Sequence, residues 1–230
     1  MLQESNGNVD AKTFQKNGCI VGVNNASFEV SKGEMLVVMG LSGSGKSTLI
    51  RHINRLIDPT HGEVIVNGTN VIDLNENQLI DFRKNEMSMV FQRFGLFPHK
   101  TVIQNVAYGL EIQGKILEER NEIAMQQIEA VGLLGFENQY PSQLSGGMQQ
   151  RVGLARALAT NPGILLMDEA FSALDPLIRK DMQDILLELQ DELHKTVVFI
   201  THDLDEALKI GDRIATVSYT HLTLPTTPYV

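Results

Sequence analysis

The chain has 230 residues, of which 43% are hydrophobic and 20% are charged. This composition can bury a sizeable core and excludes a chain that is disordered throughout, and the length suits one large domain with or without an inserted subdomain. Nineteen Lys and Arg residues against 28 Asp and Glu residues give a formal net charge of −9, which argues against nonspecific nucleic-acid binding. The single cysteine, Cys19, excludes an internal disulfide framework and a cysteine-rich zinc site.

The chain carries no sign of a membrane span or a secretion signal. No stretch reaches the roughly 18 consecutive apolar residues of a spanning helix. Residues 1–14 lack the basic-then-apolar order of a signal peptide. We therefore expect a cytoplasmic protein that works at a membrane only through a partner.

Strand patterns dominate the first 91 residues. The run 35–39 is continuously apolar, as in a strand that is covered on both faces. A glycine-rich turn and a helical pattern over 47–56 follow it. Asn67-Gly68 predicts a hairpin turn between the runs 62–66 and 71–72. Further strands are expected at 20–23, 27–30 and 87–91.

The middle of the chain has a helical character instead, with apolar residues at helical spacing over 116–131. Strand patterns return at 164–167 and 196–200, and a long helix is expected between them, starting at Pro176. Strands that alternate with helices predict an α/β fold with a parallel sheet.

These patterns divide the chain into parts. We expect a core from 1–91 and 161–216, with an antiparallel β subdomain in its first part and an inserted helical subdomain over 92–160. The stretch 217–230 has no helical or strand period and contains two prolines and four threonines. It resembles a translated sequencing adapter, so we expect a non-native tail, with the native chain continuing beyond Ala215; an ordinary flexible tail is the alternative.

A glycine-rich segment after the strand 35–39 has the chemistry of a phosphate-binding loop. Its pattern G-x-x-x-x-G-K-S is complete, and a strand precedes and a helix follows it, as the motif requires. Lys46 can reach the β- and γ-phosphates, and Ser47 can bind Mg²⁺. The alternative is a glycine-rich turn with an incidental lysine. The candidate nucleotide-binding residues are Gly40, Leu41, Ser42, Gly43, Ser44, Gly45, Lys46, Ser47 and Thr48.

Two carboxylates, Asp168 and Glu169, directly follow the strand 164–167. The carboxyl edge of a parallel sheet is where such folds bind ligands. Asp168 is expected to hold Mg²⁺, directly or through water, and Glu169 to orient and deprotonate an attacking water. Alone, the pair could equally cap a helix, because acidic residues favour that position.

The segment Ser145-Gly146-Gly147 opens another predicted helix, 23 residues before Asp168. It provides a second anion-binding helix N-terminus, which one phosphate loop does not need within the same chain. Two copies packed head to tail would use it, each completing the nucleotide site of the other. A simple helix cap is the alternative.

Together, GLSGSGKS, LSGGMQQR and LLMDEAFSALD resemble the ATP-binding subunits of ABC transporters, and the resemblance extends over about residues 18–215. It implies a phosphate-loop NTPase (RecA-like) parallel sheet, ATP and Mg²⁺ as ligands, and an ATPase that drives transport. It also implies that 40–47 form the Walker A loop, that Asp168 is the Walker B aspartate and that Glu169 is the catalytic carboxylate. The segment 145–147 matches the signature that covers the γ-phosphate of the opposite subunit.

The resemblance implies roles for three further residues. Gln92 matches a glutamine that senses Mg²⁺ and the membrane partner, Asp175 a loop that contacts the other subunit, and His202 a histidine that contacts the γ-phosphate. On their own they could be a polar loop residue, a helix N-cap and a helix-start histidine. The aromatic residue that stacks on adenine in this family has no clear match; Phe14 is the nearest candidate and could equally be a small-core residue.

Several stretches, among them SMVFQRFGLFPHKTV and THDLDEALKIGDRIA, are similar to the ATP-binding subunits of glycine betaine/proline betaine importers. The similarity implies a transported quaternary amine, a paired ATP-binding subunit, a membrane permease contacted by 94–108 and, indirectly, a periplasmic or lipid-anchored solute-binding protein. The chain is then expected at the cytoplasmic face of the membrane. The alternatives are a non-transport ABC-type ATPase acting on nucleic acid or ribosomes, and a phosphate-loop module without transport.

Overall fold

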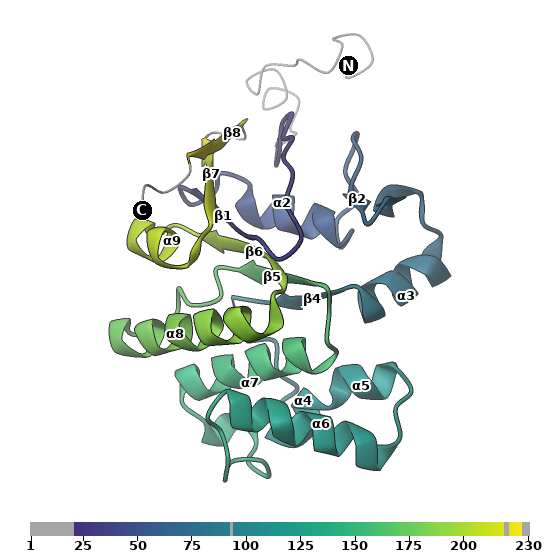
Figure 1. The fold of residues 1–230 in the computed structure, drawn as a ribbon, viewed down its shortest axis with the longest axis vertical. Helices are drawn as coiled ribbons and strands as arrows, with labels where there is room; N and C mark the ends of the chain where they lie inside the picture. Colours follow the sequence, from purple (N-terminus) through teal and green to yellow (C-terminus); the bar gives the residue numbers. More distant parts are fainter. Residues whose placement is uncertain (1–20, 93, 219–220, 227–230) are drawn as a thin grey trace.

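The computed structural model describes residues 21–92, 94–218 and 221–226. Its centre is a six-stranded sheet in the order β4-β5-β6-β1-β7-β8, in which β8 alone runs antiparallel to its neighbour (Figure 1). The expected α/β fold with a parallel sheet is confirmed. The strands are β1 (Met35–Gly40), β4 (Met87–Val90), β5 (Ile164–Asp168), β6 (Thr196–Thr201), β7 (Arg213–Ser218) and β8 (His221–Thr226).

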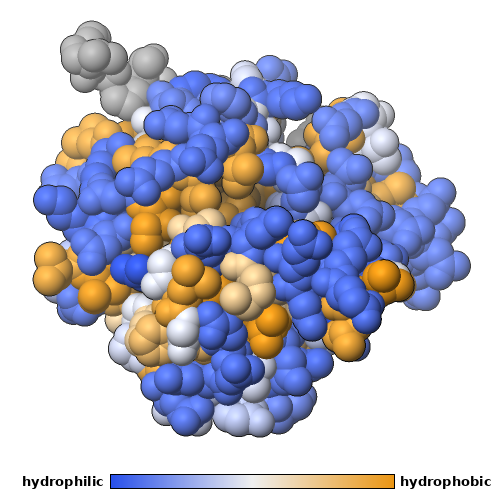
Figure 2. Space-filling model, turned by 60° about the horizontal axis from the view of Figure 1, so that its bottom comes forward, coloured by the Kyte–Doolittle hydropathy of each residue, from blue (hydrophilic) through white to orange (hydrophobic). Residues whose placement is uncertain are grey.

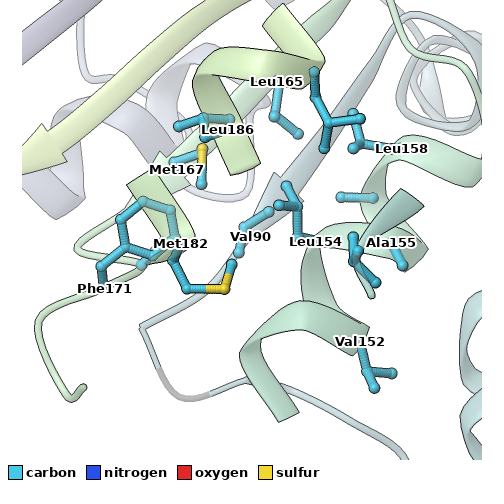
Figure 3. Packing of buried hydrophobic residues seen from close by; sticks show 14 of the residues in the cluster. Val90, Val152, Leu154, Ala155, Leu158, Leu165, Met167, Phe171, Met182 and Leu186 are labelled. Carbon is cyan, nitrogen blue, oxygen red and sulfur yellow. The ribbon is translucent and has the colours of Figure 1, made fainter. Parts of the chain in front are cut away.

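Both faces of the sheet are covered, because alternate residues of the central strands enter two separate cores. Val37 and Leu165 belong to the core on the side of α7 and α8, whereas Leu36 and Leu166 belong to the core on the side of α2 and α3. In Figure 3, Leu165 of β5 gathers with side chains of α7 and α8. The covering helices are α2 (Lys46–Ile53), α3 (Glu76–Asn85), α7 (Gly146–Ala159), α8 (Pro176–Leu193) and α9 (Leu204–Ile210).

Four α-helices of the described chain lie between β4 and β5 and form the lower part of the molecule in Figure 1. Leu110, Ile128 and Leu154 are almost completely buried there and join the core beneath the sheet. The face turned forward in Figure 2 shows apolar areas separated by hydrophilic ones. Among the described residues, no helix is both long and apolar enough to cross a bilayer. The four helices are α4 (Val102–Val106), α5 (Tyr108–Ile112), α6 (Leu117–Ala130) and α7.

A two-stranded hairpin stands apart from the main sheet. Asn67-Gly68 forms its turn, with φ values of 49° and 80° that suit an Asn-Gly hairpin. The turn was predicted, but the expected second strand at 71–72 was wrong. That segment begins a 3-10 helix instead, because the Asn70 side chain accepts a hydrogen bond from the N–H of Ile72. The elements are β2 (Ile65–Val66), β3 (Thr69–Asn70) and the 3-10 helix Val71–Asp73.

The strands expected at 20–23 and 27–30 are not formed within the described residues, and Ile20 lies outside them. Val23, Phe28 and Val30 instead pack their side chains against the core beside α2. Apolar alternation here reflects burial of side chains against a core, which does not require pairing of the backbone in a ladder.

The stretch 217–230 has no regular period in its sequence, yet its described residues continue one strand and form another. β7 continues to Ser218, and β8 pairs with it in antiparallel register, with Leu222 opposite Val217. Thr and Leu residues suit a strand, and Pro225 is compatible with an edge strand, which has one unpaired side.

Candidate functional site

The turn from β1 into α2 has the backbone geometry of a phosphate-binding loop. Gly45 has a φ of 91°, and a Cβ there would lie 1.9 Å from the carbonyl oxygen of Gly22, so only glycine fits. A Cβ on Gly40 would lie 2.3 Å from the carbonyl oxygen of Val217. At Gly43, by contrast, no described atom lies within 4 Å of a Cβ position. The loop is therefore tightly packed at its base and open on its outer side.

Two buried side chains of this loop carry groups that can donate hydrogen bonds to an anion. Lys46 is 4% exposed, and its ammonium group donates to the carbonyl oxygens of Gly40 and Leu41 at 2.8 and 3.0 Å. Ser44 is also buried, and its hydroxyl has no hydrogen-bond partner within the described chain. An unsatisfied buried hydroxyl costs about 1–3 kcal/mol, which a phosphate oxygen as acceptor would recover.

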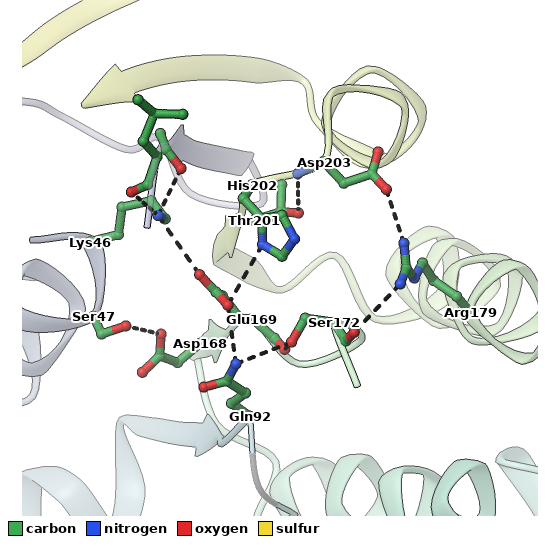
Figure 4. A network of polar contacts seen from close by, with 12 residues as sticks. Lys46, Ser47, Gln92, Asp168, Glu169, Ser172, Arg179, Thr201, His202 and Asp203 are labelled. Carbon is green, nitrogen blue, oxygen red and sulfur yellow. Dashed lines mark hydrogen bonds and ion pairs between the residues drawn. The ribbon is translucent and has the colours of Figure 1, made fainter. Parts of the chain in front are cut away.

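Asp168 connects the end of β5 to α2. Ser47 Oγ donates to its Oδ1 at 2.7 Å (Figure 4), and Arg51 Nη2 donates to its Oδ2 at 3.3 Å. This pairing of a carboxylate with a hydroxyl fits Mg²⁺, which prefers oxygen ligands and shares them with phosphates and water. No group of three His, Cys, Asp or Glu side chains is placed to hold a metal ion in the described ranges. The donor set therefore suits an ion that takes part of its ligands from a nucleotide.

Arg51 was not identified from the sequence. Its guanidinium lies 3.3 Å from Asp168 and binds the carboxylate oxygen that Ser47 does not use. The available signal was its spacing: residues four apart share one face of a helix, so Arg51 had to lie near whatever Ser47 faces.

Glu169 is the centre of the polar network in Figure 4. Its Oε1 lies 3.7 Å from Lys46 Nζ. Its Oε2 accepts a hydrogen bond from Gln92 Nε2 at 3.1 Å and lies 3.7 Å from His202 Nδ1. The backbone of Glu169 has a φ of 46°, in the left-handed region that costs a non-glycine residue about 1–2 kcal/mol. Strain of this kind concentrates at functional sites.

The structure thus gathers six of the predicted site residues after the carboxyl ends of four neighbouring parallel strands, β1, β4, β5 and β6. Thr48, a further candidate, lies against Gly22, where a Cβ would be 3.0 Å from its Cγ2. Phe14 lies outside the described residues. The gathered residues are Lys46, Ser47, Gln92, Asp168, Glu169 and His202.

The segment Ser145–Gly147 is not part of this cluster in the described chain. Ser145 is exposed and caps α7, because its Oγ accepts the N–H of Met148 at 3.3 Å. Gly146 is exposed, whereas Gly147 is buried. A Cβ on Gly147 would lie 2.4 Å from Cγ2 of Ile178, so α7 and α8 touch at this glycine.

Gly147→Ala is expected to destabilise the fold by about 1–3 kcal/mol, because the added methyl group overpacks the contact with Ile178. Gly146→Ala is the matched control: its Cβ would lie 3.7 Å from Phe94 Cζ, an ordinary contact. Urea unfolding measures the free energy of unfolding of these two variants, of Ile178→Ala and of the double variant Gly147→Ala, Ile178→Ala. Equal stability of Gly147→Ala and Gly146→Ala contradicts the packing contact. Additive effects of Gly147→Ala and Ile178→Ala in the double variant contradict it as well.

Asp175 acts as the N-cap of α8, with its Oδ1 accepting the N–H of Ile178 at 3.1 Å. The loop before it is tied to the cluster around Glu169. Ser172 Oγ donates to the carbonyl oxygen of Glu169 at 2.8 Å, and Gln92 Nε2 lies 3.3 Å from the same hydroxyl. The loop and the polar network are therefore in direct contact through Ser172.

Comparisons with known proteins agree with this geometry. The family model described as ABC transporter matches residues 23–172. The trimethylamine N-oxide transport system ATP-binding protein TmoW of Pelagibacter ubique is 62% identical over 215 residues, which are 94% of this chain and 63% of that protein. The glycine betaine/carnitine transport ATP-binding protein GbuA of Listeria monocytogenes is 62% identical over 91% of this chain and 53% of its own length. The glycine betaine/proline betaine transport system ATP-binding protein ProV of Escherichia coli is 55% identical over 88% of this chain and 50% of its own length.

The chain thus spans about half to two thirds of the length of these relatives. Two solved structures share its fold, each with a TM-score of 0.83, 36% identity and coverage of 91% of both chains. One is a dimeric bacterial ABC transporter cassette, and the other is a dimeric post-hydrolysis state of a cassette bound to ADP and phosphate. With its sequence matched over 23–172 and its fold shared with these cassettes, the chain belongs to the ABC transporter family.

Proposed function

We propose that this chain is an ATP-binding and ATP-hydrolysing subunit of an ABC importer. The observation that carries the proposal is the convergence of Lys46, Asp168 and Glu169 at the carboxyl edge of the sheet, beside the phosphate-binding loop. This edge is where open α/β sheets bind their ligands. The printed names of the relatives, which are transport ATP-binding proteins, support the same assignment.

Glu169 is the proposed general base. It accepts a proton from a water whose oxygen attacks the γ-phosphorus, and the bond from that phosphorus to the oxygen bridging to the β-phosphate breaks, which leaves ADP and phosphate. Gln92 and His202 orient the Glu169 carboxylate through its Oε2. Lys46 exchanges its carbonyl partners for phosphate oxygens and neutralises their charge.

Mg²⁺ is the proposed cofactor, with Ser47, Asp168 and Gln92 as its protein ligands. The hydrogen bond from Ser47 to Asp168 already places the first two oxygens 2.7 Å apart. Among the described residues, the Gln92 amide forms its hydrogen bonds through Nε2, and its carbonyl oxygen is the proposed ligand. When bound, the ion supplies positive charge to the β- and γ-phosphates.

A second copy of the chain is the proposed partner at the nucleotide. Ser145 and Gly146 are exposed at the N-terminus of α7, where backbone N–H groups and the helix dipole favour a phosphate. They serve the γ-phosphate bound by the other copy, and Asp175 contacts that copy from the loop before α8. The dimeric state of both similar cassettes supports this arrangement.

The proposed contact with an integral membrane permease is the segment 94–108. Asn105 is fully buried and forms four hydrogen bonds of 2.8 to 3.1 Å with the backbone of 97–101. Arg156 of α7 donates to the carbonyl oxygens of Phe94-Gly95. Burial lowers the pKa of the Arg156 guanidinium, whose charge these two acceptors help to keep. A segment held in this way transmits movement at the nucleotide to its exposed surface.

The proposed solute is glycine betaine, proline betaine or a related quaternary amine, delivered by a periplasmic or lipid-anchored solute-binding protein. The chain acts at the cytoplasmic face of the membrane and does not act on nucleic acid. The proposed motor core comprises 1–91 and 161–216, and the proposed helical subdomain 92–160 carries the signature.

Steady-state hydrolysis of MgATP tests the proposal. We expect specific activity to rise with protein concentration, because only the dimer has complete sites. In proteoliposomes that contain the permease and solute-binding protein of a glycine betaine importer, glycine betaine should raise the rate further. Activity that is independent of protein concentration contradicts the shared site, and a rate that does not respond to glycine betaine contradicts the proposed solute.

A further inference from the structure

Arg179 of α8 touches two loops of the site at once. Its Nη1 donates to Asp203 Oδ2 at 3.0 Å, directly after His202. Its Nη2 donates to the carbonyl oxygen of Leu174 at 3.3 Å. The same nitrogen donates to the carbonyl oxygen of Ser172 at 3.5 Å (Figure 4). We infer that Arg179 is a positioning residue that fixes the loop 172–175 and the His202 loop relative to each other.

Each end of this connection is held firmly by its own loop. Asp203 Oδ1 accepts the N–H of Glu206 at 3.2 Å and so caps α9, and the N–H of Asp203 donates to Thr201 Oγ1 at 3.0 Å. The Ser172 hydroxyl donates to the carbonyl oxygen of Glu169 at 2.8 Å. A displacement of either loop therefore cannot occur alone while the Arg179 guanidinium stays in place.

Arg179 is suited to this role by its shape and its anchor. A guanidinium presents donors in a fixed fork, so one side chain can bind a carboxylate and two carbonyl oxygens in different directions. Its own backbone N–H donates to the carbonyl oxygen of Asp175 at 2.9 Å, within the first turns of an 18-residue helix. The nearby Lys209 is paired with Asp184 and does not duplicate the contact.

The consequence concerns the timing of catalysis and rests on the proposed function. The loop 172–175 is the proposed contact with the second subunit, and His202 lies 3.7 Å from the catalytic carboxylate. When the second subunit binds the loop 172–175, Arg179 therefore repositions His202 in the same chain. It contacts neither the reacting atoms nor the phosphate-binding loop in the described chain, so its loss should alter turnover more than nucleotide affinity.

Hydrogen exchange of the nucleotide-free chain tests the connection without relying on activity. In Arg179→Gln, the amides of 172–175 and of 203–206 should both exchange about tenfold faster, because each loop loses a charge-assisted bond. Lys180→Gln makes the same change of charge at the next, exposed position and should leave both segments unchanged. Acceleration of only one segment, or of neither, overturns the inference.

Kinetics test its consequence. Arg179→Gln should lower kcat about tenfold and change KM for ATP less than twofold. Arg179→Lys can reach only one of the two loops, so its kcat should lie between those of the parent chain and of Arg179→Gln. Unfolding in urea shows whether Arg179→Gln is folded. If it is not, Arg179→Lys replaces it in the kinetic test. A raised KM with unchanged kcat overturns the coupling. If the parent chain does not hydrolyse ATP, the proposed function fails, and hydrogen exchange still decides the role of Arg179.

Discussion

Glu169→Gln is expected to lower the turnover of ATP by about 100- to 1,000-fold while nucleotide binding is retained. The amide has the size of the carboxylate and can still contact Gln92 and His202, but it cannot accept the proton of the attacking water. Phosphate release in steady state measures turnover, and equilibrium titration with a fluorescent ATP analogue measures affinity.

Glu188→Gln is the control for this experiment. Glu188 is an exposed residue of α8, so this substitution makes the same chemical change away from the site. Its turnover should match that of the parent chain. Unchanged turnover in Glu169→Gln would remove Glu169 from the role of general base, and an equal loss in Glu188→Gln would show that the effect is not local.

Lys46→Ala is expected to weaken ATP binding by about 10- to 100-fold, which corresponds to the loss of charge-assisted hydrogen bonds of about 1.5–3 kcal/mol. The Lys46 side chain is buried between the loop carbonyls and Glu169, so its charge lies where phosphates are proposed to bind. Lys46→Met preserves most of the volume and should show the same loss, which separates charge from packing.

Lys180→Ala, which removes an exposed lysine from α8, should leave affinity unchanged. Unfolding midpoints of the Lys46 variants check that the loop remains folded, since Gly40 and Leu41 lose a donor. Retained affinity in both Lys46 variants would rule out the phosphate-binding role of this lysine.

The sequence predicted the parallel sheet because buried strands leave a strong local signal. The runs 35–39, 164–167 and 197–200 are continuously apolar, and each lies in a strand with residues in both cores. The gathering of Lys46 and Glu169 could be expected too, since the carboxyl ends of parallel strands meet at one edge.

What the sequence could not provide were contacts whose partners are far apart in the chain. Arg51 meets Asp168 across 117 residues, and Arg179 meets Asp203 across 24 residues. An arginine that pairs with a distant carboxylate and one that faces solvent have the same local sequence pattern. Only the packing of α2 and α8 decides which carboxylate each arginine contacts.

Gly147 and β8 show the same limit in backbone terms. The glycine was singled out for a ligand, and its close approach to Ile178 depends on how two helices cross. The stretch that contains β8 shows no strand period in the sequence, and pairing with β7 decides its structure. Local propensity is overridden by tertiary contacts in such cases.

The most direct test of the central claim is sedimentation velocity of Glu169→Gln with and without MgATP. A site completed by Ser145–Gly147 of a second copy predicts a monomer that becomes a dimer only with nucleotide, and Ser145→Arg, which places a bulky charge at the exposed N-terminus of α7, should remain monomeric in the same background. A chain that binds ATP and stays monomeric contradicts the shared site, and a chain that binds no ATP contradicts the assignment as a motor subunit.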